Sequence, residues 1–158
     1  MVCISDVTER RRAEAAVQEA RDRLQYVIDN SWDIVMEVDL EGNYTFGNRA
    51  AERITGYPLE RLLRMNLSEL VAPGYRKLAF DRLRKRAAGR TDLDQPFELE
   101  IVAADGRQVR IELTTTPAYR DGRLIAIQGI ARDITQRREA QRASRAAHRK
   151  LVTAREEE

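Results

Sequence analysis

Cysteine and histidine are nearly absent from this chain of 158 residues, which has one of each, Cys3 and His148. A single cysteine excludes an internal disulfide framework and a paired-cysteine metal clip. The lone histidine lies in a charged C-terminal tail, where a solvated surface side chain is far more common than a ligand. These two counts exclude most metal-centred and nucleophilic chemistry within the chain.

Long apolar runs are missing as well. No segment approaches the roughly 20 apolar residues that a membrane-spanning helix needs. The N-terminus also lacks the charged and apolar regions of a signal peptide. We therefore expect no membrane span within this fragment and a cytoplasmic location.

The charges are close to balanced, because 28 basic and 26 acidic residues give a formal net charge of +2. No strong field points to nucleic acid, and no nucleic-acid partner is expected. Only three of the basic residues are lysines, so 25 are arginines. A codon bias of the source genome explains this excess better than phosphate recognition does.

Catalytic patterns are absent too. The glycines stand singly at turns and form no phosphate-binding loop. No histidine lies in residues 31–133 to activate a serine. Glu98 and Glu100 share a strand face like a carboxylate pair, but we expect them to be solvent-facing charges opposite Arg110. The fragment is therefore not expected to be an enzyme.

The residues that are present divide the chain into three parts. Residues 31–133 hold every glycine and proline, whereas both flanks are rich in alanine, arginine and glutamate. In residues 9–30, apolar side chains recur at the spacing of a coiled-coil heptad, at Ala13, Val17, Ala20, Leu24 and Val27. We expect a linker helix there, a second coiled-coil helix over 134–158, and a homodimer through both. Val17, Leu24 and Val27 would contact the partner.

The two flanks also share a short sequence. Residues 3–11 match residues 130–138 at an offset of 127, each with an Asp, a β-branched residue, a Thr and two arginines before a helix. A repeat at this period suggests tandem domains. Residues 1–8 are then the end of a preceding domain, represented by its last strand.

The central part alternates apolar and polar residues where strands are expected. Two strands, 34–38 and 44–46, precede a short helix over 49–54, which Asn48 would cap and Gly56 would end. A longer helix is expected over 73–88, with an apolar face of Leu78, Ala79, Leu83 and Ala87.

Three further strands follow in series, over 97–101, 109–113 and 124–131. Asp105-Gly106 and Asp121-Gly122 separate them, and Asp-Gly between alternating runs is a strong hairpin signal. Two groups of strands separated by helices predict an α+β fold, an antiparallel sheet with helices on one face.

Two stretches carry a resemblance to a known family. Residues 48–60 resemble the Asn-led helix ending in Gly-Tyr of the PAS domain, and residues 129–137 resemble its last strand running into an Asp-Ile-Thr helix start. The resemblance covers roughly residues 20–137 and implies a five-stranded antiparallel sheet with short helices on one face, over residues 31–133. It also implies a sensor module that signals to a C-terminal output domain.

The tail over residues 150–158 resembles the segment that leads into the phosphoacceptor helices of one class of histidine kinase, so a two-component histidine kinase is the expected output. The alternative is that residues 150–158 are only the charged end of a coiled coil. Two other functions stay open: a passive dimerisation spacer without ligand, and the PAS module of a cyclic-dinucleotide cyclase or phosphodiesterase.

The resemblance also bears on cofactors. Relatives that carry haem commonly use a histidine on the long helix, and residues 73–88 contain none. The flavin adduct of light-oxygen-voltage relatives needs a cysteine inside the domain, and Cys3 lies outside it. We therefore expect no cofactor and a colourless protein.

Interior residues are the remaining candidates for a ligand site. Five apolar residues would face the helices and could line a small cavity: Met36, Phe97, Leu99, Ile111 and Leu113. A filled core is the favoured interpretation, and a small apolar ligand is the alternative. Trp32 is expected to be a packing anchor between the N-terminal helix and the first strand, or to couple them.

The start of the C-terminal helix is the candidate transmission site. Asp133 or Thr135 can cap its free N–H groups. Asp133, Ile134 and Thr135 would then join the last strand to the output helix, and simple capping without signalling is the alternative.

Overall fold

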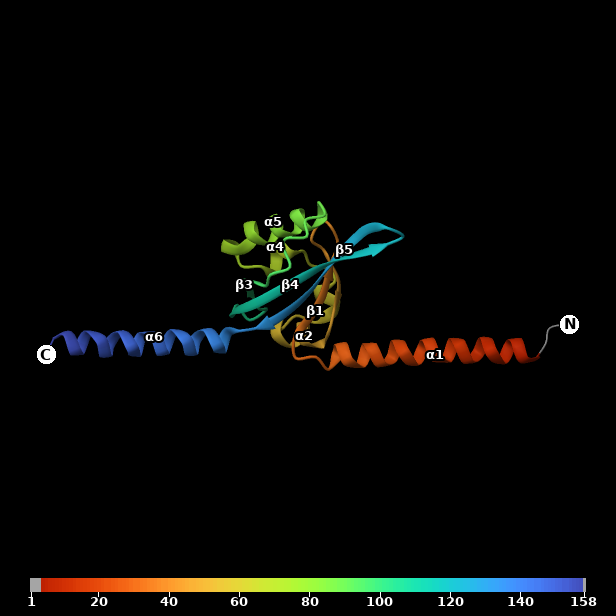
Figure 1. Cartoon of the computed structure of the whole chain (residues 1–158), viewed down its shortest axis with the longest axis horizontal. Helices are drawn as coiled ribbons and strands as arrows, with labels where there is room; N and C mark the ends of the chain where they lie inside the picture. Colours follow the sequence, from red (N-terminus) through yellow and green to blue (C-terminus); the bar gives the residue numbers. More distant parts are fainter. Residues whose placement is uncertain (1–3, 158) are drawn as a thin grey trace.

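Two long helices extend in opposite directions from a central α+β domain (Figure 1). The structure, a computed structural model, describes residues 4–157. The N-terminal helix is α1 (Ile4–Asp29) and the C-terminal helix is α6 (Thr135–Glu156), and neither has a buried residue. No described helix is long and apolar enough to cross a membrane.

The domain is built on one five-stranded sheet with the order β2-β1-β5-β4-β3, in which every neighbouring pair is antiparallel. Its strands are β1 (Ile34–Val38), β2 (Tyr44–Gly47), β3 (Phe97–Val102), β4 (Gln108–Arg120) and β5 (Arg123–Asp133). The two Asp-Gly turns connect β3 to β4 and β4 to β5, as expected. The predicted fold class is thereby confirmed, with β4 and β5 longer than the sequence indicated.

Four short helices and one 3₁₀ turn link the two groups of strands. They are α2 (Arg49–Thr55), α3 (Leu59–Leu62), α4 (Leu67–Leu70), a 3₁₀ turn η1 (Pro73–Tyr75) and α5 (Arg76–Ala87). Asn48 caps α2 and Gly56 ends it at a φ of 74°, both as expected. The helix α4 was not expected, although Asn66 and Glu69 form a complete capping box that the sequence displays.

The core lies between the sheet and helices α2 to α5, which cover one of its faces (Figure 1). The strand β3 and the start of β4 supply some of its most buried side chains, among them Leu99, Ile101 and Val109. On α5 the buried residues are Ala79, Leu83 and Arg86. Leu78, expected on that face, is 39% exposed. The inner face of α5 instead includes Arg82 and Arg86, which a pattern of apolar residues does not indicate.

The expected strand at the N-terminus is wrong for the residues that the structure describes. Residues 4–6 are the first turn of α1, whereas the matching residues 131–133 belong to β5. A strand needs a neighbouring strand for its backbone groups, and the central domain offers these residues none. Cys3 lies outside the described residues, and the preceding repeat itself stays a prediction.

Trp32 is not a packing anchor. Its side chain is 84% exposed, in the turn between α1 and β1, and the guanidinium carbon of Arg53 lies 5.4 Å from its ring centroid. Because α1 projects away from the domain, no helix or strand of residues 4–157 covers the ring on that side.

Candidate functional site at the junction of the sheet and the C-terminal helix

The hydrogen-bond ladder between β4 and β5 continues into the first turn of α6. The N–H of Ile134 donates to the carbonyl of Arg110 over 2.9 Å. The N–H of Arg110 in turn donates to the hydroxyl of Thr135 over 3.0 Å. One residue of β4 therefore binds two successive residues of the junction, and the first of them, Ile134, is buried.

The sequence left open whether Asp133 or Thr135 caps the start of α6, and in the structure the two side chains have separate roles. The carboxylate of Asp133 accepts the N–H of Thr135, at 2.9 Å, and so satisfies a free donor of the first helical turn. The hydroxyl of Thr135 does not bond to the helix N-terminus and is committed to β4 instead. Asp133 thus supports the helix start, and Thr135 ties that start to the sheet.

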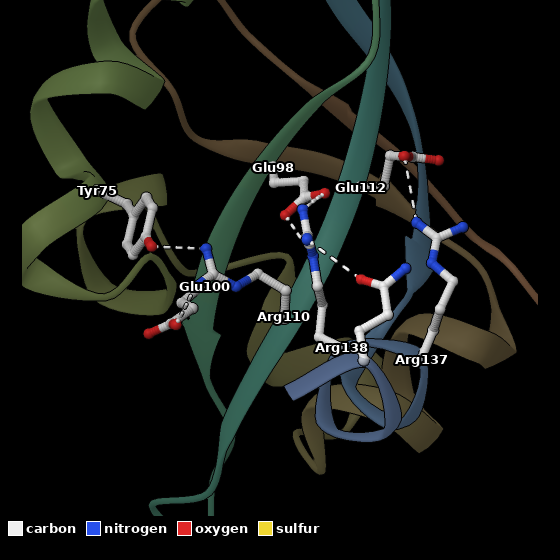
Figure 2. A network of polar contacts seen from close by, with 8 residues as sticks. Tyr75, Glu98, Glu100, Arg110, Glu112, Arg137 and Arg138 are labelled. Atoms are coloured by element: carbon white, nitrogen blue, oxygen red, sulfur yellow. Dashed lines mark hydrogen bonds and ion pairs between the residues drawn. The ribbon is translucent and has the colours of Figure 1, made fainter. Parts of the chain in front are cut away.

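Charged side chains reinforce this junction on the outer face of the sheet (Figure 2). Arg138, in the first turns of α6, binds Glu98 of β3 through Nε at 3.1 Å and through Nη2. Its neighbour Arg137 lies 3.5 Å from the carboxylate of Glu112 on β4. The view of Glu98 as a solvent-facing charge opposite Arg110 is wrong, because α6 lies over it and supplies an arginine 40 residues away in sequence.

Arg110 connects the junction to the helical side of the domain. It lies opposite Glu100 in the β3–β4 register, as expected, and forms an ion pair with it at 2.9 Å. Its Nη1 also donates to the hydroxyl of Tyr75 over 2.6 Å, at the start of α5 (Figure 2). The backbone of Arg110 therefore holds α6, while its side chain contacts β3 and the 3₁₀ turn.

The N-terminal helix is joined to β1 and β5. The buried side chain of Asn48 donates to the carbonyls of Ile28, at the end of α1, and Asp33, and it accepts the N–H of Val35. The sequence indicated only its role as a helix cap. Asp33 also binds Arg132 of β5 with two hydrogen bonds, of 3.3 and 3.2 Å, one residue before Asp133. The end of α1 is therefore attached to β1 and β5, and β5 leads directly into α6.

A small cavity lies between α5 and the inner face of the sheet, with a volume of about 50 Å³. The five residues named from the sequence as a possible cavity lining all border it: Met36, Phe97, Leu99, Ile111 and Leu113. Tyr44 also lines it, and burial raises the pKa of its phenol above the usual value, so the hydroxyl stays protonated. A second cavity of about 30 Å³ lies beside it, near α2.

Two arginines of α5, Arg82 and Arg86, also line the larger cavity, which the sequence did not indicate. Arg86 is 3% exposed, and it donates to the carbonyls of Leu93 and Thr115 and to the carboxylate of Asp94. In residues 4–157, no group of three or more metal-ligating side chains is placed to hold a metal ion.

The predicted dimer residues lie on an uncovered face of α1. Val17, Leu24 and Val27 are 52%, 63% and 62% exposed on the single chain. No part of the central domain covers them, so the stripe is available to a partner helix.

Comparison with known proteins agrees with this geometry. A family model described as the PAS fold matches residues 28–139. The signal transduction histidine-protein kinase AtoS of Escherichia coli K12 is 34% identical over 140 residues, which is 85% of this chain and 21% of AtoS. The chain therefore spans about a fifth of the length of this relative.

Solved structures share the fold at lower sequence identity. The PAS domain of a protein from Colwellia psychrerythraea is 22% identical, with a TM-score of 0.65 over 76% of this chain and 98% of that one. The PAS domain of an HTR-like protein from Haloarcula marismortui is 21% identical, with a TM-score of 0.64 over 78% and 99%. A PAS domain from a two-component sensor histidine kinase is 19% identical, with a TM-score of 0.61 over 74% and 98%.

Proposed function

Since the chain belongs to the PAS fold family, we propose that it is the sensing module of a larger cytoplasmic histidine kinase and passes a conformational change to a C-terminal output domain through α6. The observation that carries this proposal is the pair of hydrogen bonds by which the backbone of Arg110 binds Ile134 and Thr135. Because these two bonds attach the first turn of α6 to β4, a shift of β4 would displace the start of the helix as well.

Side-chain contacts also fix the start of α6 against the sheet. Arg138 and Arg137 bind β3 and β4 on the outer face, so the helix start is fixed at three points around its first two turns. Beyond these residues α6 is exposed and extends away from the domain (Figure 1). A small rotation at the sheet is therefore carried along the whole helix to whatever follows it.

The N-terminal helix provides a second path by which a movement could reach the junction, through β1 and β5. Asn48 ties the end of α1 to β1, and Asp33 ties the following turn to β5. A rotation of α1, transmitted from a preceding domain, would thus reach Asp133 through two adjacent strands. The module is suited to relay such a change as well as to originate one.

The uncovered stripe of α1 supports a parallel homodimer. An isolated helix gains nothing from exposing Val17, Leu24 and Val27, whereas two copies bury them against each other at heptad spacing. In a parallel dimer the two α6 helices emerge side by side, so a rotation of each changes their mutual contact.

A passive spacer is the alternative function, and a cyclic-dinucleotide enzyme is an alternative output. The spacer needs helices that are attached to the domain but not a junction with several independent polar contacts. The identity with AtoS favours the kinase as output over the cyclic-dinucleotide enzyme.

The autophosphorylation rate of the full-length kinase tests the proposal. Thr135→Val removes the acceptor for the Arg110 N–H and should change the rate. The matched control Thr114→Val alters an exposed threonine on the same strand as Arg110 and should not. If both variants keep the wild-type rate when normalised to folded protein, the junction is a spacer and the proposal fails.

A further inference from the structure

An open cleft of about 310 Å³ lies between the first turns of α6 and the outer face of β3 and β4. Four of its six lining residues are arginines and only one is a carboxylate, although acidic and basic residues are nearly balanced in the chain as a whole. The cleft is therefore a local concentration of positive charge, which the composition does not indicate. Its lining residues are Glu98, Arg110, Arg138, Gln141, Arg142 and Arg145, of which Figure 2 labels the first three.

These arginines differ in whether their charge is compensated. Arg110 and Arg138 each form an ion pair with a glutamate of β3. In residues 4–157, no carboxylate pairs with Arg142 or Arg145, and neither of these side chains makes a hydrogen bond. Two uncompensated positive charges therefore remain in the cleft.

The two unpaired arginines are neighbours on the helix. Arg142 and Arg145 stand three residues apart on α6, a spacing that places β-carbons about 5 to 6 Å from each other. Like charges at this distance repel, so an anion between them relieves an unfavourable interaction as well as adding a favourable one. A guanidinium is a planar fork that binds two oxygens of one phosphoryl or carboxyl group. Two adjacent forks therefore match a ligand with two linked anionic groups.

The lining also decides which kind of anion fits. No aromatic ring is among the six lining residues, so the base of a nucleotide has no side chain to stack on. A single phosphate engages only one of the two forks. A dicarboxylate carries less negative charge than a diphosphate and presents fewer oxygens to the surrounding guanidiniums. A compact anion with two linked phosphoryl groups satisfies both unpaired arginines.

We propose that this cleft binds an anion of the inorganic diphosphate class, with one phosphoryl group on Arg142 and the other on Arg145. Binding requires no output domain, so this part of the inference is independent of the proposed sensor function. Only the effect of the anion on α6 rests on that function.

An anion in the cleft would act on the contact that attaches α6 to β3. Arg138 stands one turn before Arg142 and lines the same cleft, and its partner Glu98 is the one carboxylate of the lining. A bound anion repels Glu98 and competes with it for Arg138, because both bind the same guanidinium. The attachment of α6 to β3 is thereby weakened.

Isothermal titration calorimetry of the whole chain with sodium pyrophosphate tests the site. Without divalent cations and at a fixed ionic strength, pyrophosphate should bind at a single site per chain with a Kd below about 1 mM. Phosphate, sulfate and malonate at the same ionic strength should bind at least tenfold more weakly, since none of them offers a phosphoryl group to each arginine. ADP should bind no more tightly than pyrophosphate, because the cleft offers its base no partner.

Two double variants of α6 separate the cleft from the general charge of the helix. Arg142→Gln combined with Arg145→Gln should weaken pyrophosphate binding at least tenfold. Arg149→Gln combined with Arg155→Gln removes the same charge from exposed positions that do not line the cleft, and it should change the Kd less than twofold. Circular dichroism checks that both variants keep the wild-type fold.

Glu98→Gln should have the opposite effect. It removes the competing carboxylate and releases Arg138, so pyrophosphate should bind at least threefold more tightly. Glu139→Gln makes the same change of charge on α6 itself, outside the cleft lining, and should leave the Kd within twofold of the wild-type value.

The outcomes are distinct. A Kd above about 1 mM, equal binding of sulfate, or equal losses in the two double variants would each overturn the site, because they indicate only a general attraction to a basic helix. Binding of ADP at least tenfold more tightly than pyrophosphate would show that a nucleoside is recognised and would overturn the diphosphate class. An unchanged Kd for Glu98→Gln would contradict the competition for Arg138. None of these results affects the Thr135→Val test, so the site and the proposed function fail separately.

Discussion

Glu98 of β3 binds Arg138 of α6 with two hydrogen bonds across 40 residues of sequence. The pair joins the edge of the sheet to the helix that leaves the domain. Both side chains are partly buried, which reduces the screening that weakens fully exposed pairs. The same strand residue that a sequence pattern assigns to solvent is therefore part of the junction.

The strength of this pair is measurable by a double-mutant cycle. Glu98→Gln and Arg138→Gln should show a coupling energy of about 0.5–1 kcal/mol, at the upper end of the range for partly exposed pairs. Arg10 and Glu14, an exposed pair within α1, should give only a few tenths of a kcal/mol. Urea unfolding measures both. Equal couplings would mean that Glu98 and Arg138 add nothing specific to the junction.

Arg86 is predicted to be essential for stability. Its replacement by Met leaves the carbonyls of Leu93 and Thr115 without a donor, and the loss should be about 2–4 kcal/mol. Arg84→Met, at an exposed position of the same helix, should stay within about 0.5 kcal/mol of wild type. Chemical unfolding of both variants decides this. A small loss for Arg86→Met would show that water replaces the guanidinium without cost.

Dimerisation is tested at the centre of the apolar stripe of α1. Leu24→Glu places a charge where two helices would meet, and it should weaken association at least tenfold while the domain stays folded. Sedimentation at tens of micromolar measures the mass, and circular dichroism checks the fold. Gln18→Glu adds the same charge off the stripe and should leave the dimer intact. A monomeric wild-type chain would contradict the dimer.

The β1–β2 turn should contribute a pH-dependent stability. Burial alone would raise the pKa of Asp39, but hydrogen bonds from Asn43, from its side chain and backbone, and from the backbone of Glu41 lower it below its usual value. A lowered folded-state pKa stabilises the protein above the unfolded pKa, near 4, and this stability is lost as the pH falls through the folded value. Asp39→Asn should therefore be less stable at pH 7, with a difference from wild type that shrinks below about pH 4. A constant difference across this range would exclude the carboxylate as its source.

The elements of the fold could be predicted because their signals are local. Alternation identifies β1 and β3, the two Asp-Gly turns set the hairpins, and Asn48 with Gly56 bounds α2. The capping box of α4 is an equally local signal. Each of these signals depends on residues that are neighbours in sequence.

The contacts that make the junction and the cavity are not local. The acceptors of Arg86 come from the loop after α5 and from β4, and the partner of Glu98 comes from α6. An apolar pattern on α5 cannot show that arginines line its inner face. The prediction that Trp32 is a packing anchor is wrong because the burial of a large ring depends on whether another element covers it, which the sequence does not show.

The central claim is that the sheet controls α6 through the junction at Asp133. Asp133→Ala removes the acceptor for the first helical N–H and should cost about 0.5–2 kcal/mol, the usual range for a lost cap. Asn66→Ala removes the N-cap side chain of α4, which likewise accepts a helix N-terminal N–H but lies away from the junction. The decisive measurement compares the autophosphorylation rates of the two full-length variants at matched fractions of folded protein. Asp133→Ala should alter the rate and Asn66→Ala should keep the wild-type rate, whereas equal rates for the two variants would contradict control of α6 by the sheet.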